Sequence, residues 1–169
     1  MNITNIDTAI VDKLKNAKML LTDCDGCLTD AGMYYTENGD ELKKFCAYDG
    51  MGFSLLRQQG ILTGIVTGED RELNKRRAKK IKADIIENGC KDKGRVITRI
   101  CKEHQIDLSE VVYVGDDVND LSAMEVVGVK VCPLNARPEI KAVADICLET
   151  KGGDGAIREI VDMILEARR

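Results

Sequence analysis

Acidic side chains recur in this sequence directly after short apolar runs. Asp23 and Asp25 follow the run 19–22, and Asp116, Asp117 and Asp120 follow the run 111–114. Carboxylates gathered in one cleft repel each other, so such a site requires a hard cation or raised pKa values. Mg²⁺ prefers oxygen ligands and keeps several waters, so two carboxylates and one backbone carbonyl suffice as protein ligands. We therefore predict a Mg²⁺ site with carboxylate ligands from Asp23 and Asp116, completed by Asp25.

The same residues could transfer a phosphoryl group. With its charge neutralised by the metal, the phosphate would be open to in-line attack by the second carboxylate oxygen of Asp23. Asp25 would protonate the departing alkoxide and then deprotonate the water that cleaves the aspartyl phosphate. The hydroxyl of Thr67, the amide of Gly68 and the ammonium of Lys93 would bind the non-bridging oxygens. The pattern predicts hydrolysis of a phosphate monoester.

The apolar runs before these polar residues are typical of buried strands. The predicted strands cover 19–22, 61–66, 84–87, 111–114, 129–132 and 146–148. Predicted helices cover 50–59, 70–82, 93–104, 136–142 and a segment from about 155, with one more capped by Asn119 or Asp120. This alternation favours a doubly wound, Rossmann-like parallel α/β sheet with right-handed crossovers. Because ligands bind at the carboxyl ends of such strands, the polar residues are expected to meet there.

A β-hairpin is predicted after the first strand. Residues 32–35 and 42–45 flank the polar turn 36–40, in which Asn38-Gly39 is a strong hairpin signal. Residues 31–46 are called the flap below. The flap, one helix and one strand fill the interval up to the next polar strand end, so we expect no separate cap domain.

Length and composition fit one domain over residues 1–169. With 44% hydrophobic residues the chain can bury a core, and a second domain has no room. A net charge of -4 gives no electrostatic reason to expect nucleic-acid or membrane binding. The chain has no apolar run near the roughly 20 residues of a membrane span, and residues 1–18 do not resemble a signal peptide. We expect a cytoplasmic protein that acts on a small molecule.

The cysteines do not indicate disulfides or a zinc site. Their number, seven, is odd, and the chain is long enough to fold on its core alone. Cys24-x-x-Cys27 has the spacing of half a zinc site or of a redox motif, but no second pair exists and His104 is the one histidine. We interpret Cys24 and Cys27 as small apolar core side chains.

Four motifs together resemble those of the haloacid dehalogenase superfamily. They are Asp23-Cys24-Asp25-Gly26-x-Leu28-Thr29-Asp30, Thr67 after a strand, Lys93, and Gly115-Asp116-Asp117-x-x-Asp120. One such motif alone would be weak evidence of membership, whereas four motifs in the family's order are strong evidence. The resemblance implies the roles given above, with Asp117 and Asp120 supporting the metal site from behind its direct ligands. For Asp117, a purely structural role in supporting the loop is as well founded as an indirect contact with the metal.

The whole chain resembles the capless, tetrameric branch of that superfamily. This branch includes 3-deoxy-manno-octulosonate (KDO) 8-phosphate phosphatase and the phosphatases of nine-carbon, sialic-type acid 9-phosphates. A capless site would be open to water, so we expect a homotetramer in which a neighbouring subunit covers it. The tail 152–159 is similar to one that reaches a shared site in the branch, which implies substrate contact by Arg158. A glycine turn before the last helix is the structural alternative.

The residue after the second motif bears on the substrate. Octulosonate enzymes of the branch usually carry a basic residue there, whereas this chain has Glu69. Members resembling 2-keto-3-deoxynononate (KDN) 9-phosphate phosphatase have glutamate, then an arginine-rich helix and a lysine matched by Lys80. The resemblance implies that Glu69 binds sugar hydroxyls and that Arg77 or Lys80 meets the substrate carboxylate. A solvated helix face is the alternative for these basic residues.

The sequence therefore favours a Mg²⁺-dependent phosphatase of KDN or N-acetylneuraminate 9-phosphate, with KDO 8-phosphate as the alternative substrate. Two other classes have similar features. A related domain appended to animal sialic acid cytidylyltransferases serves in assembly, so a non-catalytic oligomerisation domain is one alternative. A response-regulator receiver is another, but its acidic pair and phosphoacceptor lie on different strands. The acid at Asp25, two residues after the nucleophile, favours turnover over signalling.

Overall fold

Strands of Val, Ile and Leu form the centre of the structure. The computed structural model describes residues 6–39 and 41–169, so the first five residues and position 40, the end of the predicted hairpin turn, lie outside the description. The main sheet contains β1 (Met19–Thr22), β4 (Leu62–Val66), β5 (Ile85–Glu87), β6 (Val111–Val114), β7 (Val129–Cys132) and β8 (Ile146–Cys147). All of its pairings are parallel, in the order β5-β4-β1-β6-β7-β8. The predicted doubly wound α/β fold is confirmed.

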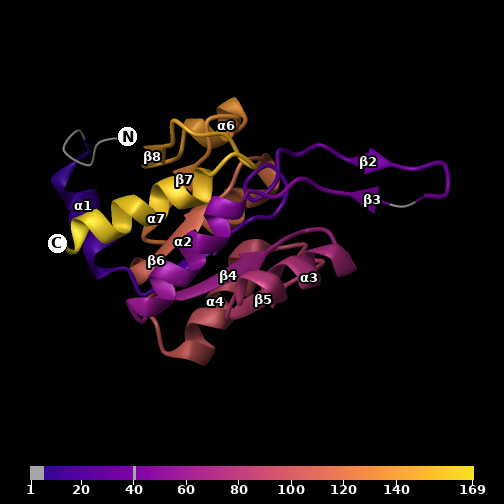
Figure 1. Cartoon of the computed structure of the whole chain (residues 1–169). Helices are drawn as coiled ribbons and strands as arrows, with labels where there is room; N and C mark the ends of the chain where they lie inside the picture. Colours follow the sequence, from indigo (N-terminus) through magenta and orange to yellow (C-terminus); the bar gives the residue numbers. More distant parts are fainter. Residues whose placement is uncertain (1–5, 40) are drawn as a thin grey trace.

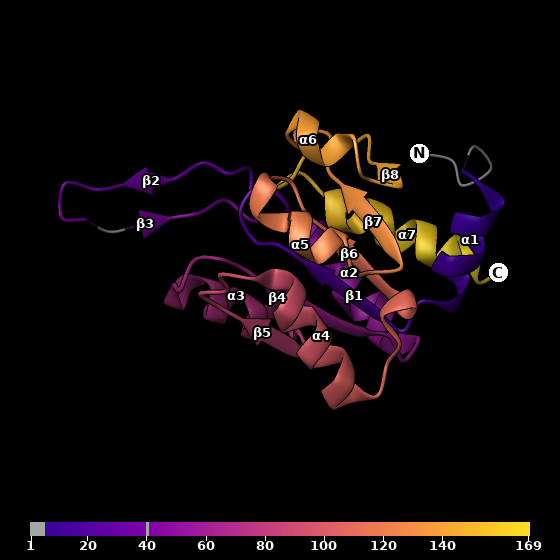
Figure 2. The same ribbon diagram turned by 180° about the vertical axis from the view of Figure 1, so that it is seen from behind.

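Helices cover both faces of this sheet. They are α1 (Thr8–Asn16), α2 (Ala47–Gln58), α3 (Glu72–Ile81), α4 (Lys93–His104), α5 (Leu121–Met124), α6 (Pro138–Lys141) and α7 (Ala156–Ala167), with short 3-10 turns η2 (Leu108–Glu110) and η3 (Val118–Asp120). Helices α1, α2 and α7 lie on the face toward the viewer in Figure 1, and α4 and α5 lie on the face seen in Figure 2. None of the described helices is both long and apolar enough to cross a bilayer.

Successive side chains of β1 enter two different hydrophobic clusters. Leu20 belongs to the cluster that contains Phe53 of α2 and Ile160 of α7. Leu21, the next residue, belongs to the cluster that contains Ile97 of α4. Side chains alternate across a strand, so a strand buried on both faces needs apolar residues at every position. This is why the strands read as continuous apolar runs in the sequence.

Helix α1 was not predicted. Its sequence carries the mixed charges of a surface segment, but Leu14 is fully buried and Ile10 packs against the same cluster. Asp7 caps the helix by accepting a hydrogen bond from the Ala9 N–H at 2.8 Å. Two apolar residues four apart are a weak periodic signal, and packing against α7 supplies the stability that the local sequence lacks.

A buried carboxylate fixes the start of α7. Asp49 of α2 is fully buried and accepts a hydrogen bond from the Arg158 N–H at 2.9 Å. Burial raises the pKa of Asp49 to about 6, against the opposing effect of this bond. The first N–H groups of a helix have no partner within the helix, so Asp49 supplies one. The tail 152–155 therefore enters α7 at a defined point.

The flap is an antiparallel hairpin that projects from the body of the molecule in both ribbon views (Figures 1 and 2). Its strands are β2 (Tyr34–Tyr35) and β3 (Glu41–Leu42). The Gly39 N–H donates to the Thr36 carbonyl at 3.0 Å, and Gly39 has φ +84°, a conformation that glycine adopts at little cost. The turn thus lies at the predicted Asn38-Gly39 signal.

Candidate active site

Three neighbouring strands deliver the predicted residues to one edge of the sheet. Strand β1 lies between β4 and β6, so Asp23, Thr67 and Asp116 follow adjacent strands. The Asp23 N–H donates to the Val114 carbonyl at 2.9 Å, which extends the β1–β6 pairing to the site. A pocket of about 490 Å³ opens there, lined by Asp23, Asp25, Ala31, Met33, Thr67, Gly68, Glu69, Asp116, Asp117, Val118 and Asn119.

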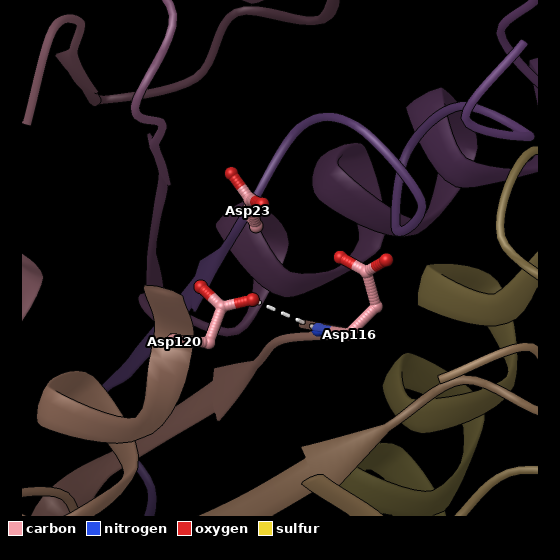
Figure 3. A group of neighbouring side chains, drawn as sticks. All are labelled: Asp23, Asp116 and Asp120. Carbon is pink, nitrogen blue, oxygen red and sulfur yellow. Dashed lines mark hydrogen bonds between the residues drawn. The ribbon is translucent and has the colours of Figure 1, made fainter. Parts of the chain in front are cut away.

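Carboxylates from two of these strand ends surround a common space. Asp23, Asp116 and Asp120 offer oxygen atoms that all lie within 4.8 Å of one another (Figure 3). Gly26 makes the approach possible, because a Cβ at that position would lie 2.0 Å from Asp116 Oδ2. Gly26 also has φ +84°, which disfavours other residues. Steric contact with Asp116 therefore explains why glycine follows the acidic pair at position 26.

Asp120 holds the site together through both of its oxygens. Oδ1 accepts from Lys93 Nζ at 2.6 Å and from the Tyr113 hydroxyl at 2.5 Å. Oδ2 accepts from the N–H groups of Asp116 at 2.9 Å and Asp117 at 3.3 Å. Both oxygens of Asp120 are thus occupied by donors from Lys93, Tyr113 and the backbone of the Asp116 loop.

Asp120 occupies the N-cap position of α5, one of the two positions predicted, but its side chain makes no capping hydrogen bond to that helix. The Asp120 carboxylate is directed at Lys93 and the loop before it, and in the described chain α5 receives no side-chain cap. The cap belongs instead to η3, where Asp117 Oδ1 accepts from the Val118 N–H at 2.7 Å. Asp117 also lines the pocket, so both of its interpretations remain compatible with its position.

Lys93 is a buried cation between two aspartates. Its side chain is 1% exposed, and Nζ lies 3.0 Å from Asp23 Oδ1 in addition to its bond with Asp120. Burial disfavours the ammonium, but the charges of Asp23 and Asp120 outweigh burial and raise the pKa of Lys93. Lys93 therefore stays protonated and compensates part of the negative charge.

Lys93 does not fully compensate the negative charge of Asp23 and Asp116. Burial, with repulsion from Asp120, raises the pKa of Asp23 to about 6. Burial, with repulsion from Asp23, Asp120 and Asp117, raises the pKa of Asp116 to about 7. A small hard cation would relieve this repulsion, and Asp23 and Asp116 can offer it oxygens because Asp120 is already engaged. The residues present fit Mg²⁺, with Asp23 and Asp116 as the carboxylate donors.

Asp25 lies at the edge of the pocket in contact with the flap. Its Oδ1 accepts from the Thr29 hydroxyl at 3.1 Å, and its Oδ2 accepts from Lys43 Nζ at 2.7 Å. Lys43 Nζ also donates to Glu69 Oε2 at 2.9 Å. Burial opposes the Lys43 charge, but its hydrogen bonds to Asp25 and Glu69 outweigh burial and raise the pKa of Lys43. Two predicted site residues thus share one cation.

The C-terminal tail packs behind the loop that carries Asp23 and Asp25. The Gly152 N–H donates to Asn135 Oδ1 at 2.7 Å, and Asn135 Nδ2 donates to the Gly26 carbonyl at 3.0 Å. A Cβ at Gly152 would lie 1.9 Å from the Gly26 carbonyl oxygen, so this contact requires glycine. Within its own chain the tail supports the loop.

The basic residues expected to bind substrate do not line this pocket in the part of the chain that the structure describes. Arg77 donates to the Cys46 carbonyl at 2.7 Å and lies 5.0 Å from the centre of the Phe45 ring. Lys80 is exposed on α3, and the Arg158 side chain pairs with Asp162 at 2.8 Å. Arg77 and Lys80 instead line a second hollow with Lys43 and Phe45.

Cys24 and Cys27 are fully buried, as predicted. Burial raises the pKa of both thiols. All seven cysteines are free thiols in this structure. The core interpretation of the Cys24-x-x-Cys27 pair is confirmed.

Lys43, Asn135 and Tyr113 were missed by sequence reasoning. Lys43 is one of twenty-five basic residues, and no spacing rule separates it from Lys44 beside it. Tyr113 was predicted only as a strand residue, although an aromatic hydroxyl within a buried strand needs a partner and so signals one. Contacts between segments that are distant in the chain leave no pattern in the local sequence, so the partners of these residues could not be recognised from it.

Comparison with known proteins agrees with this geometry. A family model described as haloacid dehalogenase-like hydrolase matches residues 58–160. The 3-deoxy-D-manno-octulosonate 8-phosphate phosphatase of Haemophilus influenzae is 33% identical over 156 residues, covering 92% of this chain and 87% of that protein. The enzyme of the same name from Escherichia coli K12 is 32% identical over 163 residues, covering 96% and 87%.

Solved structures give the same result. The 3-deoxy-D-manno-octulosonate 8-phosphate phosphatase of Moraxella catarrhalis, in complex with magnesium, phosphate and KDO, superposes with a TM-score of 0.91. The two chains are 36% identical, and the match covers 94% of this chain and 91% of that one. The cobalt-bound enzyme of Haemophilus influenzae matches with a TM-score of 0.88 at 33% identity, covering 92% and 91%.

Replacement of Asp116 by Asn should stabilise the metal-free protein while removing its response to Mg²⁺. The folded-state pKa of Asp116 lies above its ordinary value, so its ionisation costs folding stability as pH rises from 3.8 to about 7. The variant should gain on the order of 1–2 kcal/mol over wild type at the upper end of this range and little at the lower end. Thermal melting in EDTA across this pH range measures the difference.

Mg²⁺ should raise the melting temperature of the wild type and leave Asp116→Asn unchanged, because a ligand stabilises the state that binds it. Asp12→Asn, at an exposed position of α1, is the control and should behave as wild type. An equal response of wild type and Asp116→Asn to Mg²⁺ would exclude Asp116 as a ligand.

Proposed function

The chain belongs to the haloacid dehalogenase-like hydrolases and is a Mg²⁺-dependent phosphoric monoester hydrolase, and we propose that its substrate is an ulosonic acid phosphate, KDO 8-phosphate first. The observation that carries the chemistry is the buried Asp23, held beside Lys93 and facing Asp116 at the floor of an open pocket. Asp25 lies two residues further on at the pocket edge.

In the first half-reaction Asp23 attacks phosphorus. A bond forms between its carboxylate oxygen and phosphorus while the bond to the sugar oxygen breaks, and Asp25 gives its proton to that leaving oxygen. Asp23 and Asp116 would hold Mg²⁺, which would supply charge neutralisation for the phosphate. Lys93 and the Gly68 amide bind the non-bridging oxygens, and Thr67, whose residue is 2% exposed, adds its hydroxyl.

In the second half-reaction Asp25 takes a proton from water. The resulting hydroxide attacks phosphorus, the bond to Asp23 breaks, and inorganic phosphate leaves. Asp25 thereby regains the proton that it gave in the first step, so each cycle consumes one phosphate monoester and one water and leaves the enzyme unchanged. Asp120 keeps Lys93 in place throughout, because it accepts the Lys93 hydrogen bond at 2.6 Å.

The relatives favour the eight-carbon substrate. The curated relatives and the ligand-bound structure reported above are named for KDO 8-phosphate, and the match spans most of each chain. The nine-carbon acids that the sequence favoured are the second candidate. The observation in their favour is Glu69, an acid that lines the pocket where the octulosonate enzymes usually carry a basic residue.

We also propose a homotetramer that acts in the cytoplasm. Support comes from the flap, where Tyr34, Tyr35 and Leu42 are 53%, 64% and 60% exposed. Apolar side chains in a projecting hairpin are expected to be covered by another surface. A neighbouring subunit in that place could bring Lys80 or Arg158 to the open pocket.

Replacement of Asp23 by Asn should abolish turnover without unfolding the protein. The amide oxygen is a poor nucleophile, whereas its size matches the carboxylate, so we expect a loss of at least about 10³-fold in kcat. Phosphate release and circular dichroism measure the two properties. Turnover near the wild-type rate would remove Asp23 as the nucleophile.

The substrate is tested by phosphate release from KDO 8-phosphate, KDN 9-phosphate and N-acetylneuraminate 9-phosphate at matched concentrations, with and without Mg²⁺. We expect the highest kcat/KM for KDO 8-phosphate and no turnover without the metal. A nine-carbon preference would overturn the substrate while keeping the mechanism. Inactivity on all three would support a non-catalytic oligomerisation domain.

Sedimentation of the active enzyme should give the mass of a tetramer of the 18.7 kDa chain. Replacing Tyr34 and Leu42 by Ser should shift the equilibrium toward smaller species and lower activity, because the pocket would lose its cover. A fully active monomer would refute a shared active site.

A further inference from the structure

Lys43 joins three segments that are distant in the sequence. Its ammonium lies 2.7 Å from Asp25 Oδ2, on the loop after β1, and 2.9 Å from Glu69 Oε2, on the loop after β4. It also lies 3.6 Å from Glu41 Oε1 in β3 of the flap. A single cation thus connects the flap to both walls of the pocket.

The Lys43 side chain is enclosed by its partners. Its side chain is 0% exposed, unlike that of the neighbouring Lys44, which is 51% exposed and pairs with Asp154 at 2.6 Å. Glu41 is itself shared with Arg71, whose Nε lies 3.4 Å from Oε2. Because burying a long cation is costly unless its partners are in place, the Lys43 contacts constrain all of the segments that they join.

The arrangement also holds Asp25 from two sides. Thr29 donates to one carboxylate oxygen at 3.1 Å and Lys43 donates to the other at 2.7 Å. Without Lys43, Asp25 would keep one hydrogen bond, and Asp25 and Glu69 would repel each other across the pocket. Proton transfer to a leaving group depends on the donor being within hydrogen-bond reach of it.

We propose that Lys43 is a positioning residue that acts through Asp25: it fixes the proton donor against the leaving oxygen and makes this geometry depend on the position of the flap. The proposal rests on the phosphatase activity proposed above and is independent of which sugar acid is the substrate. Its consequence is selective, because leaving groups that form stable anions need little help from an acid.

The test compares two aryl phosphates that lack a sugar. Phenol, with a pKa of about 10 like that of tyrosine, leaves with difficulty unless it is protonated, whereas p-nitrophenol leaves readily as its anion. Replacement of Lys43 by Met should lower kcat/KM for phenyl phosphate by about 10²-fold, at the lower end of the contribution of a general acid. The comparison uses kcat/KM because it reports the steps up to departure of the leaving group, whereas kcat also contains the hydrolysis step in which Asp25 acts as a base. For p-nitrophenyl phosphate the loss should stay below roughly 5-fold, since that step needs no proton.

A double-mutant cycle separates this role from a general one. If Lys43 acts through Asp25, adding Lys43→Met to Asp25→Asn should cause no further loss with phenyl phosphate. Lys43→Arg should recover part of the activity, because a guanidinium can also bridge two carboxylates. Lys44→Met is the matched control and should equal wild type with both substrates.

Equal losses on both aryl phosphates, or a further loss in the Asp25→Asn background, would overturn the role of Lys43 and leave the phosphatase function intact. No phosphate release by wild type from these esters or from the three sugar-acid phosphates would refute the proposed function itself. Should Lys43→Met fail to fold, Lys43→Ala provides the test, because water can then enter and solvate Asp25 and Glu69 while the ammonium that contacts Asp25 Oδ2 is still absent. It should give the same selective loss on phenyl phosphate, and an unselective loss would again overturn the proposal.

Discussion

The crowding of carboxylates around one buried ammonium is the constraint on which the site depends. Lys93 pairs with Asp23 and Asp120, and it cannot neutralise Asp116 as well. The raised pKa values of Asp23 and Asp116 show that the folded chain bears a cost in holding them together. Electrostatic repulsion that lowers folding stability is typical of functional sites. A divalent cation bound by these carboxylates would relieve the repulsion and stabilise the folded state.

The surrounding structure keeps these charges at fixed distances. Parallel strands place the three loops at one edge of the sheet, and residues without a Cβ allow the loops to approach closely. Asp120 connects the Lys93 ammonium to the backbone of the Asp116 loop, while Asn135 connects the Gly26 loop to the C-terminal tail. The loops at this edge of the sheet are thus linked to one another by hydrogen bonds, whereas the flap projects from the body of the molecule.

The flap and the loops at the sheet edge meet at Lys43. Because its ammonium contacts both Asp25 and Glu69, the proton donor and the residue that distinguishes this chain from the octulosonate pattern are linked physically. The sequence favoured nine-carbon acids because of Glu69, the basic helix after it and Lys80, whereas the relatives favour KDO 8-phosphate.

The sequence alone determined the features that depend on local periodicity and on side-chain chemistry. Apolar runs indicated the strands of the sheet, Asn38-Gly39 indicated the hairpin, and the spacing of Asp23, Asp25 and Asp116 after strands predicted a metal site and indicated the reaction class. The tertiary structure decided the cap of η3, the burial of α1, the direction of Asp120 and the position of Lys43. These depend on contacts between segments far apart in the chain, where the free energy comes from burial and charge pairing that no local pattern records.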